Sequence, residues 1–216
     1  MEKTVSEAIQ NRRSVRIFKE NKLDSSKVKD CIYNATLAPN SSNLQLWEFV
    51  HVNDPLYLKK LSKACMNQSA AKTASQIVVV VTRRDLWKKR SKENIEFLNT
   101  QYKKNLITEK RYKKALKYYK KLIPILYFDI LGLLGVIKYL IFQFIGLFVP
   151  VVRQITRTDL RIVVHKTAGL AAQNFMNSMS AIGYDTCPME GSDTLMVKKI
   201  LNIPRGAEIN MVIGCG

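Results

Sequence analysis

Three arginines flank one serine near the start of the chain, in the stretch NRRSVRIF that covers residues 11–18. The guanidinium groups of Arg12, Arg13 and Arg16 can form charge-assisted, partly bidentate hydrogen bonds to a terminal phosphate, and the hydroxyl of Ser14 can add another. A solvated helix end would contain the same residue types. The pattern therefore predicts either an anion site or an ordinary basic surface, and the residues alone leave both open.

Two further segments carry groups that suit a ligand. The stretch APNSSNLQLWEF places hydroxyl and amide side chains before an expected strand, where they can hydrogen-bond a polyhydroxyl chain or the edge of a ring: Ser41, Ser42, Asn43 and Gln45. The stretch GYDTCPMEG has a proline and a glycine that fix a loop between helices, so that Pro188 or Met189 can lie against a planar ligand. Either segment could equally be an ordinary turn.

Side chains for metal or triad chemistry form no recognisable pattern. The chain has four widely spaced cysteines without a CxxC pair, so we expect reduced thiols and no metal site: Cys31, Cys65, Cys187 and Cys215. The two histidines, His51 and His165, belong to no recognisable triad, and His165 is expected to be a packed or interface residue. The sequence therefore predicts neither a metal centre nor a catalytic side chain.

The elements that must position these segments are helices interleaved with a few strands. Apolar spacing and capping residues predict helices over 4–12, 25–39, 158–183 and 192–203. Alternating or continuous apolar runs predict strands over 47–53, 76–83 and 207–216, the first two in one sheet. With only about three strong strands, an α+β fold around a mixed sheet is favoured over a doubly wound fold.

A long segment does not fit this core, and we expect a single domain over residues 1–216 with an insertion at about 83–157. Its first part, 83–121, is basic and helical, with 15 Lys or Arg against 4 Asp or Glu, and so supplies 11 of the net charge of +18. Such a balance suits phosphates, nucleic acid or an anionic membrane surface. Nucleic-acid binding is the weakest of these, because lysine-rich helices are usually solvated faces.

The second part of the insertion, 122–152, is apolar but does not read as a membrane span. A span needs about 20 apolar residues, and Lys138 divides the run into shorter pieces. The elements on both sides should lie on one side of any membrane, and 31 residues are too few for two crossings. We expect two short apolar helices, broken near Gly132, Gly135 and Lys138. They pack over the domain or a partner subunit, or they lie on an anionic membrane with the lysines on its headgroups.

Five segments together resemble the nitroreductase-like FMN-dependent oxidoreductases. They occur in the order and context of that family, across residues 1–82 and 158–216: RRSVRIF, SSNLQLW, ASQIVVVV, GLAAQNFMNSMSAIGYDTCPMEG and IPRGAEINMVIGCG. The resemblance implies a nitroreductase-like α+β fold with a central mixed sheet flanked by helices. It also implies an intertwined homodimer with two FMN sites at the subunit interface.

The resemblance also implies roles for individual residues. One group would grip the FMN phosphate and ribityl chain: Arg12, Arg13, Ser14 and Arg16. A second group would reach the flavin of the other subunit: Ser41, Ser42 and Asn43, with Gln45 in the same loop. Asn67 would bond the pyrimidine edge of the flavin. A last group would form the loop over the ring, where a backbone N–H meets flavin N5: Pro188, Met189, Glu190 and Gly191.

The chain departs from the family pattern at three points. Ala70 stands where the family often has a lysine, so one positive contact to the ring is missing. Leu46 stands where a proline usually precedes the tryptophan, a change in turn rigidity. Family members normally continue beyond the last strand into a basic tail that completes the phosphate site, and we expect the sequence to be truncated after Gly216.

The function implied by the resemblance is that of a flavin enzyme. NADH or NADPH would reduce FMN, and the flavin would pass the electrons to a small acceptor such as a nitroaromatic or a quinone in a ping-pong cycle. The alternatives are a membrane-peripheral scaffold that keeps the fold with little turnover, and a reductive dehalogenase-like relative. The N-terminus lacks an apolar signal core, so we expect a cytoplasmic protein, with membrane association left open.

Overall fold

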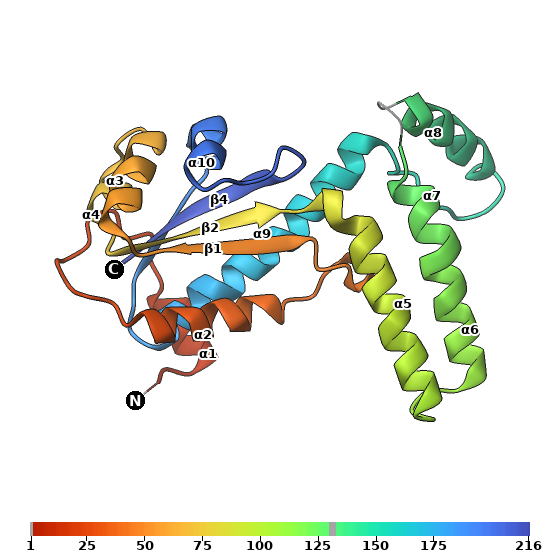
Figure 1. Ribbon diagram of the computed structural model, residues 1–216, viewed down its shortest axis with the longest axis horizontal. Helices are drawn as coiled ribbons and strands as arrows, with labels where there is room; N and C mark the ends of the chain where they lie inside the picture. The colour runs from red at the N-terminus through yellow and green to blue at the C-terminus, as the bar shows by residue number, and fades with distance from the viewer. Residues whose placement is uncertain (1, 130–132) are drawn as a thin grey trace. The chain divides into compact units, whose positions relative to one another are not determined.

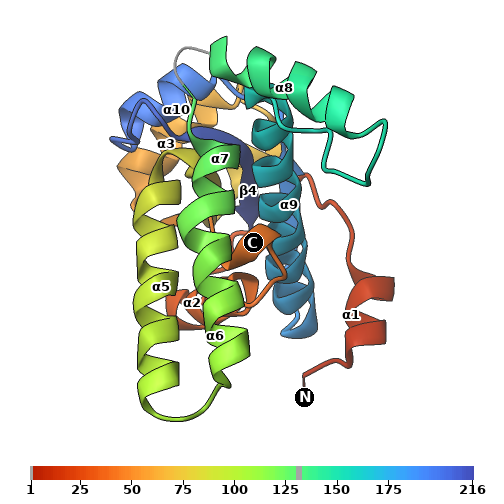
Figure 2. The same cartoon turned by 90° about the vertical axis from the view of Figure 1, so that its right-hand side faces the viewer.

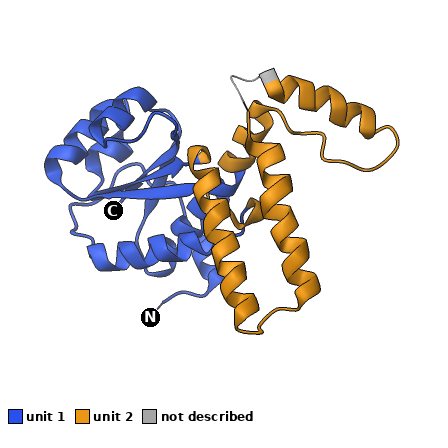
Figure 3. Cartoon of the chain, turned by 45° about the vertical axis from the view of Figure 1, so that its right-hand side comes forward, with its two compact units in different colours: residues 1–40, 47–83, 166–216 blue, residues 41–46, 84–165 orange. Residues whose placement is uncertain are grey.

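The computed structural model describes residues 2–129 and 133–216, with Leu133 described by its backbone alone, and the chain forms two compact units (Figure 3). Unit 1 comprises the residues up to 40 together with 47–83 and 166–216. Unit 2 comprises 41–46 and 84–165, and so contains most of the expected insertion together with the serine-rich loop. The prediction of a single domain stays a prediction. Gly132, one of the expected break points, lies outside the described residues.

Unit 1 contains a four-stranded sheet with the order β1-β2-β4-β3. Its strands are β1 (Trp47–Val52), β2 (Gln76–Thr82), β3 (Thr186–Met189) and β4 (Glu208–Cys215). The α+β class is confirmed, and so is the expected pairing of β1 with β2. All three ladders are antiparallel, so the expectation of a mixed sheet needs correction. Among the described residues the parallel component is a single isolated bridge between Ser14 and Thr186.

Strand β3 corrects the sequence interpretation of the GYDTCPMEG stretch. Pro188 and Met189 lie in this strand and pair with Ile213 and Val212 of β4, whereas they were expected in a loop. Proline cannot donate to a ladder, but an edge strand has one side without a partner strand and therefore tolerates it. Strand β3 is such an edge. The loop that the resemblance places over the flavin ring thus begins only after Met189.

Helices cover both faces of the sheet of unit 1 (Figure 1). They are α1 (Val5–Asn11), α2 (Ser25–Thr36), α3 (Pro55–Ala64), α4 (Ser69–Thr73), α10 (Thr194–Ile200) and the unit 1 part of α9 (Arg157–Ala181). Helices α3, α4 and α10 pack on one face, and α2 and α9 pack on the other. The four helices predicted from apolar spacing are therefore confirmed.

The alternation of side chains along β2 builds the two cores of unit 1. Val79 and Val81 point into the cluster with α3, α4 and α10, while Val78 and Val80 point into the cluster with α2 and α9. All seven residues of β2 are buried, as expected for a strand covered on both faces. The pairing of β2 with β4 shifts between Val80 and Val81, where the register passes over one residue of β4.

Local capping explains where several helices begin. Thr4 and Glu7 form a reciprocal capping box at α1, with the Glu7 amide donating to Thr4 Oγ1 at 3.3 Å. Asp24, Asp54 and Asp193 cap α2, α3 and α10 through their carboxylates. Helix α1 nevertheless buries only Ala8, because Val5 and Ile9, expected on its apolar face, are exposed.

Unit 2 is built mainly from helices (Figure 2). Its elements are η1 (Ser41–Asn43), η2 (Arg84–Leu86), α5 (Trp87–Lys103), α6 (Glu109–Lys117), the π-helical turn η3 (Tyr118–Leu122), α7 (Ile123–Tyr127), α8 (Leu133–Ile145) and the first residues of α9. Helices α5 and α6 form a hairpin in which Tyr102 stacks on Tyr112 with ring centroids 4.4 Å apart.

The core of unit 2 lies where the serine-rich loop meets the insertion. Leu44 and Leu46 are buried there against Ile123, Tyr127 and Leu160. Burial raises the pKa of the Tyr127 hydroxyl to about 12. The leucine that replaces the usual family proline therefore fills this core.

Two of the expected break points in the apolar part of the insertion, Gly135 and Lys138, do not interrupt a helix. Gly135 and Lys138 are inside α8, and the described helix α7 ends at Tyr127. A single glycine costs a helix only about 1 kcal/mol, and lysine is a good helix former, so neither must end it. Two short apolar helices are nonetheless present, as predicted.

Candidate functional site

The arginine segment of unit 1 follows α1 and runs beside the start of β3. The Ser14–Thr186 bridge joins the two segments, and the amide of Val15 donates to the carbonyl of Thr186 at 3.3 Å. Arg13 Nη1 donates to the carbonyls of Gln10 at 2.6 Å and Arg12 at 2.8 Å. The Arg13 guanidinium therefore closes the C-terminal end of α1.

The guanidinium groups of Arg12 and Arg16 lie near β3, whereas that of Arg13 bonds carbonyls at the end of α1. Arg12 Nη1 is buried and has no hydrogen-bond partner among the described residues. Burial raises the pKa of the Cys187 thiol, and the nearby positive charges of Arg16 and then Arg12 oppose that rise. Both guanidinium groups thus act electrostatically on the same point of β3. An unpartnered buried guanidinium nitrogen is costly, and an anion would satisfy it.

A cavity of about 410 Å³ lies in unit 1 beside this segment. Three segments that are distant in sequence line it: Ser14, Arg16, Gln68, Ser69, Ala70, Cys187 and Pro188. The lining combines one cation, hydroxyl and amide groups and small apolar side chains, and it contains no carboxylate. The structure therefore brings Ser14, Arg16 and Pro188 together at one cavity.

One hydrogen bond and one close backbone approach shape the surroundings of this cavity. Gln68 Nε2 donates to the carbonyl of Gly191 at 2.7 Å, which ties the start of α4 to the loop after β3. A side chain at Gly214 of β4 would place its Cβ 2.8 Å from the carbonyl oxygen of Ala70. Glycine at that position lets the sheet approach the Ala70 backbone closely. Glu190 and Gly191 are exposed in the loop after β3.

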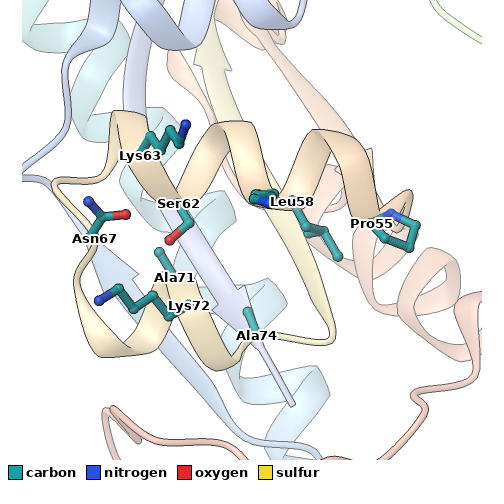
Figure 4. Close-up of a pocket in the computed structure, with 9 residues that line it drawn as sticks. Pro55, Leu58, Ser62, Lys63, Asn67, Ala71, Lys72 and Ala74 are labelled. Carbon is teal, nitrogen blue, oxygen red and sulfur yellow. The ribbon is translucent and has the colours of Figure 1, made fainter.

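Asn67 lies beside the cavity of the arginine segment but lines a different one. That second cavity, of about 430 Å³ between α3 and α4, also contains Ser62, Lys63 and Lys72 (Figure 4). Figure 4 shows Asn67 and Ser62 facing one another across it. The backbone N–H of Asn67 donates to the carbonyl of Ser62 at 2.9 Å. The role implied for Asn67 at a flavin edge stays a prediction.

The serine-rich loop belongs to unit 2, where residues of the insertion hold it. Ser42 Oγ hydrogen-bonds the hydroxyl of Tyr118 at 2.6 Å, and the hydroxyl of Tyr119 donates to the carbonyl of Ser42 at 2.9 Å. Asn94 Nδ2 donates to the carbonyl of Asn43 at 2.8 Å. The insertion therefore supports a loop that lies more than 40 positions earlier in the sequence.

Sequence reasoning missed the three residues that make these contacts. Tyr118, Tyr119 and Asn94 lie in the basic segment 83–121, whose charge gives no indication of these contacts. The two tyrosine rings meet edge to face at 5.4 Å, and they lie in η3, a π-helical turn. Such turns are rare and frequent at functional sites, but no local pattern in the sequence predicts one.

Removing either tyrosine hydroxyl should loosen this loop. We expect Tyr118→Phe and Tyr119→Phe each to lower the free energy of unfolding by about 1 kcal/mol, the usual net worth of one hydrogen bond. Urea unfolding measures the change. Tyr33→Phe is the matched control, since that side chain is 64% exposed. Equal stability of all three variants would contradict the support described for Ser42.

Backbone strain gathers in two of the loops under discussion. Ser42, Asn43 and Gln45 have φ angles of 59°, 49° and 47°, and Met66 and Asn67 have φ angles of 56° and 54°. Left-handed backbone costs a residue with a side chain about 1–2 kcal/mol, although asparagine tolerates it. Strained residues cluster where a ligand or a switch needs a defined geometry, so both loops are candidate binding elements.

His51 takes part in a side-chain hydrogen bond within unit 1. His51 Nε2 bonds Gln76 Oε1 at 2.5 Å, and the amide nitrogen of Gln76 donates to the carbonyl of Leu23 at 2.9 Å. Within residues 2–129 and 133–216, no three His, Cys, Asp or Glu side chains are grouped to hold a metal ion. All four cysteines are free thiols and buried.

The cavity beside the edge strand β3, with its guanidinium and hydroxyl groups, suits an anionic ligand. The sequence model of the Nitroreductase family matches residues 9–216. The chain therefore belongs to the nitroreductase family.

Three comparisons illustrate the likeness. The chain is 26% identical to the protein DrgA of Synechocystis over 211 residues, which are 97% of this chain and 82% of DrgA. It is 28% identical over 182 residues to MhqN of Bacillus subtilis, named as an NAD(P)H nitroreductase, covering 83% of this chain and 71% of MhqN. A solved nitroreductase in complex with FMN from Exiguobacterium sibiricum superposes with a TM-score of 0.68 at 20% identity, covering 99% of this chain and 87% of that one.

Proposed function

We propose that the protein is an FMN-dependent oxidoreductase that uses NADH or NADPH to reduce a small acceptor. One observation carries the proposal: the cavity of unit 1 places Arg16 and Ser14 beside β3, with a buried, unpartnered nitrogen of Arg12 next to the same strand. Membership of the nitroreductase family supports the oxidoreductase class. The FMN complex of the Exiguobacterium protein and the name of MhqN support the cofactor and the reductant.

The donor set of the cavity fits the phosphate end of FMN. Guanidinium groups bind phosphate oxygens through strong charge-assisted bonds, and the Arg12 nitrogen lacks any other partner among the described residues. The cavity lining contains no carboxylate that would repel a phosphate. When bound, FMN would supply the two-electron chemistry, and no side chain has to act as the redox group.

The residues of the chain would bind and orient the cofactor. Arg12 and Arg16 would neutralise the phosphate, and the Ser14 hydroxyl would add a hydrogen bond. The bond between Gln68 and Gly191 would hold the loop after β3 in place beside the cavity. Ala70, where the family often has a lysine, contributes only a small apolar surface to the lining.

The proposed working form is a homodimer in which Ser41, Ser42 and Asn43 of one subunit reach the flavin held by the other. The strained backbone of Ser42 and Asn43, and its support by Tyr118 and Tyr119, favour a loop with a fixed binding geometry. The acceptor would be a nitroaromatic or a quinone that follows NAD(P)H into the same place, giving ping-pong kinetics.

A scaffold with little turnover is the second candidate, and Ala70 is the observation that favours it, since a positive contact to the ring is missing there. The two candidates differ in reduction of the flavin, because a scaffold can bind FMN without accepting hydride efficiently.

Absorbance of the purified protein tests the proposal. We expect a flavin spectrum, bleaching by NADH or NADPH without oxygen, and recovery on addition of a nitroaromatic or a quinone. Light scattering should give the mass of two chains. Failure of the full chain to retain or rebind FMN would contradict the proposal, whereas bound FMN that neither reductant bleaches would favour the scaffold.

A further inference from the structure

Helix α8 and the segment that follows it expose an unusual amount of apolar surface. We name residues 134–152 the apolar arm; Figures 1 and 3 show α8 set apart from the α5–α6 hairpin within unit 2. Its large apolar side chains are mostly well exposed: Val136, Ile137, Tyr139, Leu140, Ile141, Phe144, Ile145, Leu147, Phe148, Val149 and Val152. None of the hydrophobic clusters of the described residues includes an arm side chain. An apolar patch of this kind marks an interaction surface.

The polar side chains in and beside the arm form hydrogen bonds with nearby oxygen atoms of the chain. Lys138 Nζ donates to the carbonyl of Phe128, and burial lowers the pKa of Lys138. Arg153, just after the arm, donates from Nη1 to Gln143 Oε1 at 2.6 Å and from Nη2 to the carbonyl of Gly146 at 2.5 Å. These contacts close the end of α8, and Phe148 packs edge to face on Phe144 at 5.4 Å. The arm is thus an ordered segment whose exposed surface is mainly apolar.

The length of α8 suits a position along a lipid surface. A helix of 13 residues is about 20 Å long, shorter than the roughly 30 Å hydrocarbon core of a bilayer. Among the described residues, no helix combines the length and the apolar character that crossing a membrane requires. A helix in the plane of the interface buries its apolar side chains below the headgroups instead.

The positive charge of unit 2 is not evenly compensated. On α5, Lys89 and Arg90 pair with Glu93, and Lys92 pairs with Glu96. Among the cations of α6 and η3 that have no ion pair within the described residues are Arg111, Lys114, Lys117 and Lys121. They line one groove of about 800 Å³, together with the apolar side chains of Leu122 and Ile125. The groove therefore combines free positive charge with apolar surface.

We propose that the apolar arm and this groove dock the protein on an anionic lipid surface. The arm would lie at the boundary of headgroups and acyl chains, and the four groove cations would meet headgroup phosphates. Charge decides between a lipid surface and a second copy of the chain, because a second copy would bring an equally cationic groove against the first. Docking is independent of the proposed flavin chemistry.

Co-sedimentation of the full chain with vesicles tests the proposal. We expect binding to vesicles of equal parts phosphatidylcholine and phosphatidylglycerol at low salt, and little binding to phosphatidylcholine alone. The variant K114Q/K117Q/K121Q should bind roughly a hundredfold more weakly, at about fivefold for each cation. K59Q/K60Q/K63Q removes the same charge from α3 in unit 1 and should bind like the parent. If both triple variants lost vesicle binding equally, the binding would depend on overall charge and not on the groove, which would overturn the proposal.

A second pair of variants tests the arm itself. Phe148→Trp adds a fluorophore, and brominated lipids should quench its added emission if the arm enters the acyl boundary. The variant F144D/F148D should lose vesicle binding and keep the helical circular dichroism of the parent. Two results would overturn the proposal: no binding of the parent chain to anionic vesicles, or an F144D/F148D variant that becomes monomeric while its vesicle binding is unchanged. The second result would assign the arm to a subunit interface.

Discussion

Replacing Arg16 by alanine is expected to weaken FMN binding roughly ten- to a hundredfold, and Arg12→Ala should act similarly. A hydrogen bond to a charged group is worth about 1.5–3 kcal/mol, and each guanidinium supplies at least one to a phosphate. In addition, Arg12 Nη1 is buried without a partner among the described residues, and a bound phosphate would supply one. Fluorescence titration of the apoprotein with FMN measures both constants.

Lys19→Ala is the control for this pair, since it removes one positive charge from an exposed position three residues beyond Arg16. The control should bind FMN within about twofold of the parent, because a screened surface charge contributes little. Unchanged FMN affinity in both arginine variants would refute the assignment of the phosphate site. Losses of equal size in all three would assign the effect to overall charge.

Truncating Phe175 to alanine should destabilise unit 1 by about 3–5 kcal/mol, the range for a large aromatic in a packed core. Phe175 lies on α9, is 0% exposed, and packs in the cluster that contains Val78, Val80 and Ile213. Because folded domains are stable by only about 5–15 kcal/mol, such a loss lowers the midpoint of thermal unfolding by many degrees.

Phe97→Ala makes the same chemical change on α5 at a side chain that is 61% exposed. It should cost less than about 1 kcal/mol, as surface substitutions usually do. Urea unfolding of both variants gives the comparison. If Phe175→Ala were no more costly than Phe97→Ala, the central position of α9 in the core would be wrong.

Periodicity predicted the fold of unit 1 well, and the reason is burial. The continuous apolar run of β2 and the helical spacing of α9 are patterns imposed by a core on both sides of a sheet, so they are visible in the residues. Strand β3 was not predicted because it has four residues, contains a proline and pairs on one side only. Its partner strand, 20 or more positions later, is what defines it.

The candidate site was predictable in part for a similar reason. Ser14, Arg16 and Pro188 could be named from side-chain chemistry and family resemblance, and the structure brings them to one cavity. The contacts of Tyr118, Tyr119 and Asn94 with the serine-rich loop could not be named. They depend on a π-helical turn and on a pairing across some 50 to 77 positions, neither of which leaves a local pattern.

The left-handed backbone at Ser42, Asn43, Gln45, Met66 and Asn67 also bears on how these loops can vary among related chains. At such positions the backbone alone disfavours valine, isoleucine and threonine, whether or not a ligand is ever bound. Restricted variation there would therefore have two sources, and the accepted replacements separate them. If only the left-handed backbone restricts these positions, glycine can replace serine or asparagine there. If a bound flavin needs the side chain, glycine cannot replace it.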